Sequence, residues 1–173
     1  MKKLFALLLV ALIPLAGAFA EEPSVPVADL GDIEIVFSEN RVILAGDLSF
    51  SLPEGWTALD LTQELTESGI LFAAEPADLG HVIGLSYAQI GANDTTQLAD
   101  ALAQSFQDVA IVKANGMEMI RYTGEGGAYT GLSLLDGAGG MYTLTISPMP
   151  SDELAAAAFA LLSTLEFADP AEG

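Results

Sequence analysis

The chain of 173 residues has few side chains that could act as a nucleophile or a general base. It has no cysteine and one histidine, His81. A catalytic histidine needs a nucleophile beside it, and no Gly-x-Ser-x-Gly motif occurs in the sequence. His81 is therefore interpreted as an exposed turn residue at the start of a strand. Without cysteine or a second histidine, a structural zinc site is excluded. The sequence predicts no catalytic residue, no metal-ligating residue and no cofactor.

Carboxylates are the abundant reactive groups, with 24 Asp and Glu. Two facing acids can hydrolyse a glycosidic bond, so a small secreted carboxylate-dependent hydrolase is the alternative hypothesis. No Asp-Thr-Gly or Asp-Ser-Gly motif occurs, and Asp94 in NDTT (93–96) is interpreted as a helix cap. The segment DGAGG (136–140) lacks acids at the alternating positions of an EF-hand loop. Weak calcium binding through scattered acids stays open, without a location.

Seven glycines fall within residues 124–140. A phosphate-binding loop places such glycines between a strand and a helix N-terminus, whose free N–H groups hold the anion. Here the glycines separate strand-like segments, and no Lys-Ser or Lys-Thr pair follows them. We therefore predict that Gly126 and Gly139 serve hairpin turns and bind no phosphate.

The first twenty residues have the pattern of a cleaved signal peptide. Two lysines precede the apolar run Leu4–Ile13, and Ala18-Phe19-Ala20 has the small-x-small form of a cleavage site. We expect cleavage after Ala20, a secreted or periplasmic location, and no membrane span in the mature chain. The mature chain would keep only three basic residues against 24 acids, which argues against nucleic acid and anionic membranes as partners.

Residues 21–31 carry two prolines and are interpreted as a linker, and residues 32–173 as a single domain. Helices are expected over 93–108 and from Ser151 onwards, because both segments begin with a capping residue and carry an apolar stripe. One or two further helical turns are expected within 58–68. Strands are expected at 32–37, 41–44, 47–52, 69–75, 81–90, 109–113, 117–123, 128–135 and 141–146.

Aromatic side chains give limited information about a binding site. Trp56 follows a turn and is interpreted as a core residue. In strand 81–90 one face is bulky and the other is small, which predicts that a helix approaches the small face. Four tyrosines are assigned to strands and could line a groove on an uncovered sheet face: Tyr87, Tyr122, Tyr129 and Tyr142.

The order of strands, helix, three-strand meander and helix predicts an α+β fold, an antiparallel sheet with two packed helices. The stretch LSFSLPEGW, the mid-chain helix, the glycine-punctuated meander and the closing LLSTLEF together resemble the PsbP-like (Mog/PsbP/LpqN-type) sandwich over residues 47–167. That resemblance implies a non-enzymatic domain that binds protein partners or lipid-like ligands. We therefore expect an exported bacterial binding or accessory domain, with an unknown protein partner or apolar ligand. A cell-envelope structural protein is a third possibility.

Overall fold

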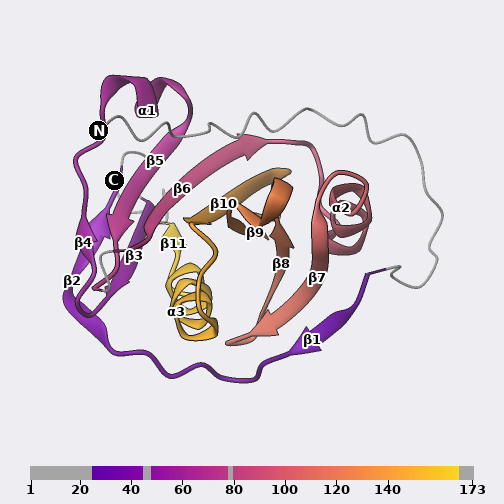
Figure 1. The fold of residues 1–173 in the computed structure, drawn as a ribbon, viewed down its shortest axis with the longest axis horizontal. Helices are drawn as coiled ribbons and strands as arrows, with labels where there is room; N and C mark the ends of the chain where they lie inside the picture. Colours follow the sequence, from indigo (N-terminus) through magenta and orange to yellow (C-terminus); the bar gives the residue numbers. More distant parts are fainter. Residues whose placement is uncertain (1–24, 45–47, 78–79, 168–173) are drawn as a thin grey trace.

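The computed structural model describes residues 25–44, 48–77 and 80–167, so the expected signal peptide lies outside the described residues (Figure 1). The elements follow one another as β1 (Val27–Asp29), β2 (Phe37–Ile43), β3 (Leu48–Pro53), β4 (Thr57–Ala58), α1 (Gln63–Glu67), β5 (Ile70–Glu75), β6 (Val82–Gln89), α2 (Thr95–Leu102), β7 (Gln107–Ala114), β8 (Met117–Thr123), the 3-10 turn η1 (Glu125–Gly127), β9 (Thr130–Leu135), β10 (Gly140–Ser147), α3 (Asp152–Leu162) and β11 (Glu166–Phe167).

An eight-stranded sheet with the order β1-β7-β8-β9-β10-β6-β5-β4 forms the body of the molecule. The α+β class is confirmed, but the sheet is mixed because β1 runs parallel to β7. This strand lies in the segment 21–31, which was expected to be a linker. Val27 pairs with Ile111 and Asp29 with Lys113. Local composition does not reveal a partner so far along the chain, which explains the error.

The main core lies on the concave face of the large sheet. Helix α3 lies inside the curve of this sheet, and a three-stranded sheet with the order β11-β3-β2 also packs on that side (Figure 1). Phe50 of β3 and Phe72 of β5 meet edge to face, with ring centroids 4.9 Å apart. The small sheet and α3 thus enclose one apolar core, whose largest fully buried members include Phe50, Phe159, Ile83, Leu85, Met119, Leu132, Leu144, Ile146, Leu161 and Leu162.

Helix α2 covers part of the opposite, convex face. Leu98 and Leu102 pack with Ile111 of β7 and Ile120 of β8 in a second apolar cluster. Because successive side chains of a strand point to opposite faces, the alternating apolar residues of β7 and β8 supply both clusters. The protein is therefore layered as α2, the large sheet, and then α3 with the small sheet.

The two predicted helices begin where their caps indicate. The Asp94 Oδ1 accepts a hydrogen bond from the N–H of Gln97 (3.0 Å), and the Ser151 Oγ accepts one from Leu154 (3.2 Å). Helix α2, which was expected to extend to residue 108, is shorter: it ends at Leu102, and β7 already begins at Gln107. Pairing of Gln107 with Thr123 draws these residues into the sheet, so tertiary contacts override the helical spacing.

Two further expectations need correction. Residues 32–36 form no strand but an extended connection between β1 and β2, and only Phe37 of the expected segment 32–37 belongs to β2. Their apolar alternation has another cause, since Ile33 and Ile35 are partly buried while Glu34 is exposed. In β6, α3 packs on the side of the bulky Ile83 and Leu85 and not on the small face.

The glycine-rich segment connects strands, as predicted. DGAGG joins β9 to β10 in an antiparallel hairpin, where Gly139 has φ +89°. Gly126, with φ +65°, lies in the 3-10 turn between β8 and β9. Both glycines adopt a left-handed conformation that side-chain-bearing residues avoid, which is why glycine is needed at these turns.

Candidate functional site

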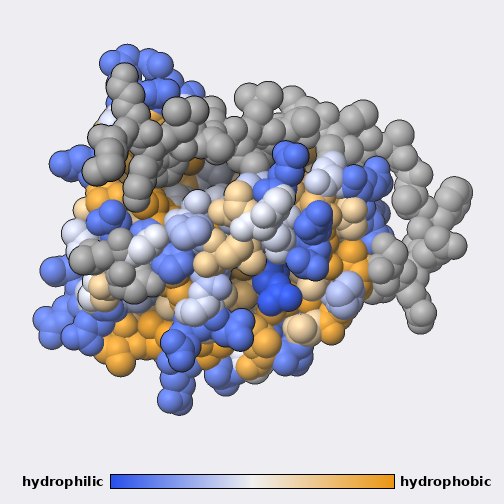
Figure 2. Space-filling view, viewed as in Figure 1, coloured by the Kyte–Doolittle hydropathy of each residue, from blue (hydrophilic) through white to orange (hydrophobic). Residues whose placement is uncertain are grey.

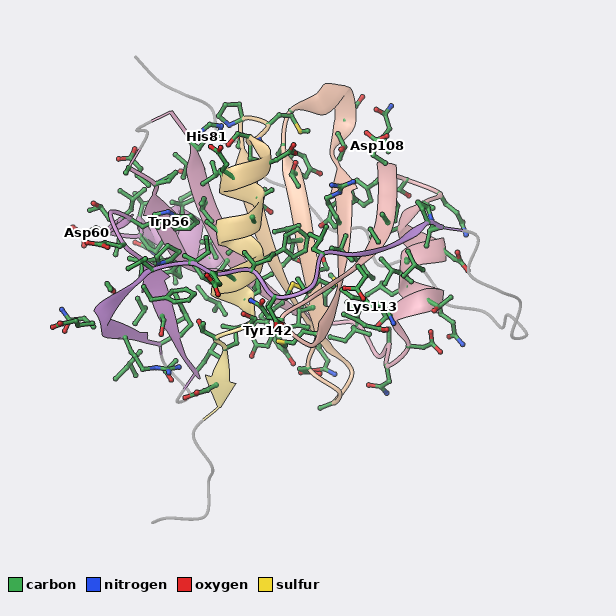
Figure 3. All side chains as sticks on the ribbon, turned by 90° about the horizontal axis from the view of Figure 1, so that it is seen from below. Trp56, Asp60, His81, Asp108, Lys113 and Tyr142 are labelled. Atoms are coloured by element: carbon green, nitrogen blue, oxygen red, sulfur yellow. The ribbon has the colours of Figure 1, made fainter. Side chains whose placement is uncertain are left out.

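The residues singled out in the sequence do not converge on one site. His81, Trp56, Tyr142 and Lys113 occupy separate parts of the molecule (Figure 3). Trp56 is partly buried against the main core, as predicted. The His81 Nε2 donates to the carbonyl oxygen of Met149 (3.1 Å), which ties the start of β6 to the segment before α3. This hydrogen bond gives His81 a structural role.

The prediction that four tyrosines line one groove is wrong. Tyr87 and Tyr142 pair across β6 and β10 on the concave side, with ring centroids 4.8 Å apart. Tyr122 and Tyr129 belong to the cluster beneath α2 on the convex side. Burial raises the pKa of Tyr122 and raises that of Tyr129 to about 12. Opposite sheet faces therefore separate the two pairs.

Asp136 organises the hairpin between β9 and β10. Its Oδ1 accepts the N–H groups of Ala138 (2.7 Å) and Gly140 (2.8 Å). The Tyr87 hydroxyl lies 3.1 Å from Asp136 Oδ2 and 2.8 Å from Gln89 Oε1. Burial alone would raise the pKa of Asp136, but these hydrogen bonds outweigh it and hold that pKa below its ordinary value. The Asp136 carboxylate therefore stabilises the turn between β9 and β10.

A shallow hollow of about 340 Å³ adjoins β1 at one end of the large sheet. It is lined by Asp29, Gly31, Asp32, Lys113, Ala114, Gly116, Met117 and Glu118. Three of these residues are acids and one is a base, so the hollow has an excess of negative charge. The lining residues come from the end of β1 and the segment after it, and from the end of β7, the turn and the start of β8.

The lysine in this hollow is held in an ion pair. Lys113 Nζ lies 2.7 Å from Glu118 Oε1. The hydrogen bond to Glu118 and its charge raise the pKa of Lys113, and Asp29 adds to the effect. The turn motif Asn115-Gly116 could have revealed this pair, because a two-residue turn places positions 113 and 118 opposite each other. Asp29 could not be placed in this way, because its partner strand is remote.

Both sheets end in an edge strand that carries exposed apolar side chains. On β1 and the residue after it, Val27 is 50% and Leu30 is 51% exposed. At the small sheet, Ile43 of β2 is 74% and Val36 just before it is 68% exposed. Figure 2 shows hydrophobic surface at the lower left, where Figure 1 places β2 and β3. An edge strand presents unpaired N–H and C=O groups, so these edges are the surfaces best suited to bind another chain.

The described residues offer neither a metal site nor a membrane-spanning helix. Residues 25–44, 48–77 and 80–167 contain no group of three or more His, Asp or Glu side chains that could hold a metal ion. Within those ranges, no helix has the length and apolar character needed to cross a bilayer.

Comparison with known proteins yields a fold likeness. No protein-family model and no curated protein matches the chain. A crystal structure from Bacteroides thetaiotaomicron VPI-5482 matches with a TM-score of 0.51 and 18% sequence identity. The match covers 76% of this chain and 49% of the other, so this chain spans about half the length of that protein. At this identity the two proteins are similar in fold, and nothing about activity follows.

Proposed function

We propose that this protein is an exported, non-enzymatic binding domain that acts through a protein partner. The observation that carries the proposal is a pair of sheet edges, unpaired among the described residues, whose apolar side chains are at least half exposed. Val27 and Leu30 mark one edge, and Val36 and Ile43 mark the other. A soluble domain normally blunts its edges with charge, bulges or covering loops, and exposed apolar edges invite strand addition by another chain.

The acids also favour a binding domain over a carboxylate-dependent hydrolase, because two of them are engaged in structural contacts. Asp136 holds a turn, and Glu118 is paired with Lys113. The large negative charge, formally −19, favours a cationic partner and would assist its encounter at low salt. The function also agrees with what the resemblance to PsbP-like proteins implies.

A pull-down from native culture tests this function. Purified protein carrying a C-terminal tag should retain one or a few specific proteins, identified by mass spectrometry. Val27→Lys and Ile43→Lys place a charge at one edge each, and at least one of the two variants should lose the retained protein. Lipids extracted from the same eluate address the apolar-ligand form of the hypothesis. Retention of the same proteins by a variant charged at both edges would overturn the proposal.

A further inference from the structure

At the β1 edge, the outward backbone groups of two residues form no hydrogen bond within the part of the chain that the structure describes. The Pro26 carbonyl accepts from Ile111 N–H (2.9 Å), and Leu30 N–H donates to the Lys113 carbonyl (2.8 Å). Alternation along a parallel ladder then turns the N–H and C=O groups of Val27 and Asp29 away from β7. Since β1 is the last strand of its sheet, these groups face outward.

The side chains along this edge have two different characters. Val27 and Leu30, each about half exposed, lie on opposite faces of the sheet and offer apolar contact on both sides. Asp29 follows in the strand and lines the acidic hollow with Asp32 and Glu118. The open backbone edge and the excess negative charge therefore occur side by side.

We propose that the β1 edge binds an extended basic segment of a partner protein by strand addition. This inference rests on the proposed function and names its location and the chemistry of the partner. The segment pairs with the outward groups of Val27 and Asp29, and one of its Lys or Arg side chains enters the hollow beside Asp29 and Asp32. Charge complementarity selects this occupant, because three acids face one lysine there and the whole chain is strongly acidic.

A peptide titration followed by NMR tests the location. The probe is a synthetic peptide of alternating Lys and Val, and its control is the same peptide with N-methylated backbone amides on one edge. Amide signals of residues 27–31 and of Lys113 should shift with the first peptide. The N-methylated peptide has the same charge but cannot complete the ladder, so it should bind roughly tenfold more weakly or worse.

Two proline variants provide a matched comparison of the edges. Val27→Pro removes an outward N–H without breaking a bond to β7, and it should weaken peptide binding by roughly tenfold or more. Ile43→Pro makes the same change at the β2 edge, where Leu44 N–H bonds inward to the Leu48 carbonyl (2.8 Å). It should leave the affinity unchanged. Circular dichroism spectra of both variants would serve as the control that they are folded.

Neutralising the hollow tests the charge requirement. The double variant Asp29→Asn/Asp32→Asn should lower the affinity for the peptide by roughly tenfold. The control, Glu64→Gln/Glu67→Gln on the distant helix α1, removes the same number of negative charges and should have little effect on that affinity. Three results would overturn the β1 inference. The two double variants could lose affinity equally, the N-methylated peptide could bind as tightly as the first peptide, or the amide signals of residues 27–31 could fail to shift. Peptide binding that is lost only in Ile43→Pro would also overturn it, while leaving a protein-binding function intact. The pull-down decides that function separately.

Discussion

The side-chain oxygen of Asn115 accepts a hydrogen bond of 2.6 Å from the backbone N–H of Ile33. The Nδ2 of the same side chain donates to Ser163 Oγ (3.0 Å), just beyond the end of α3. Asn115 also has φ +51°, a conformation that asparagine tolerates better than most residues. One turn residue between β7 and β8 thus joins the β1–β2 connection to the residue that caps the C-terminal end of α3.

Replacing Asn115 by alanine should therefore lower the free energy of unfolding by about 3–4 kcal/mol. The change removes two hydrogen bonds, worth about 1 kcal/mol each, and adds a left-handed penalty of about 1–2 kcal/mol. Asn115→Gly removes the bonds but accepts the backbone conformation, so it should cost less than alanine. Urea unfolding followed by circular dichroism measures both. Equal stability of the alanine variant and the parent would show that these bonds contribute nothing net.

Gly131 is required by the ring of Tyr122 on the neighbouring strand. The two residues face each other across β8 and β9, and a Cβ at position 131 would collide with the tyrosine ring. We expect Gly131→Ala to destabilise the fold by about 1–3 kcal/mol, the usual cost of overpacking. Tyr122→Leu removes the ring and should reduce the cost of the alanine. A double-mutant cycle in urea checks this coupling. Additive effects of the two changes would refute the steric explanation.

The tyrosines should make the protein sensitive to alkaline pH. Burial, with smaller effects of Tyr122 and Glu125, raises the pKa of Tyr129 from 10.0 to about 12. Above pH 10 the unfolded chain loses this proton before the folded chain does, so the free energy of unfolding falls as pH rises from 10 to about 12. Below pH 10 this contribution is fully present. The phenolate absorbance should rise together with the loss of circular dichroism. Tyr129→Phe should show a shallower fall in stability over the same pH window. Ionisation of all tyrosines at pH 10 with the fold intact would contradict the prediction.

Salt should stabilise the folded protein at pH 7. The chain has five basic residues against 24 acids, so most acids have no base to pair with and repel one another. Ion pairs within the described residues join Arg41 with Glu166 and Lys113 with Glu118. Sodium chloride shortens the Debye length from about 30 Å at 0.01 M to about 8 Å at 0.15 M, which screens this repulsion. The melting temperature should therefore rise over that range. Calcium at matched ionic strength should raise it further only if the folded state binds the ion. A falling melting temperature would refute the repulsion argument.

Export should remove residues 1–20. The basic start, the apolar run and Ala18-Phe19-Ala20 motivate this expectation. N-terminal sequencing of protein from the periplasm or the culture medium should begin at Glu21. Recovery of folded protein that still begins with Met1 from the cytoplasm alone would contradict it.

Local patterns predicted those parts of the fold that depend on neighbouring residues. The caps Asp94 and Ser151 identified two helix starts, and the glycines at 126 and 139 identified turns. The strand β1 and the end of α2 at Leu102 were missed, because each depends on pairing with a remote segment. The acidic hollow was missed for the same reason, since it forms only when Asp29 comes beside Lys113.

Two strand pairings join segments that are far apart in the sequence, which bears on when each part of the fold can form. Residues of β7 to β10 pair with their sequence neighbours, whereas Glu166 pairs with Ser49 and Val27 with Ile111. Contacts between remote segments form slowly because long loops must close first. During synthesis, β3 gains α3 on its inner face and β11 at its edge only after residues up to Phe167 have left the ribosome. If the chain is exported as predicted, such a delay would favour its passage through a membrane pore, because β3 lacks these partners until residue 167 has been made.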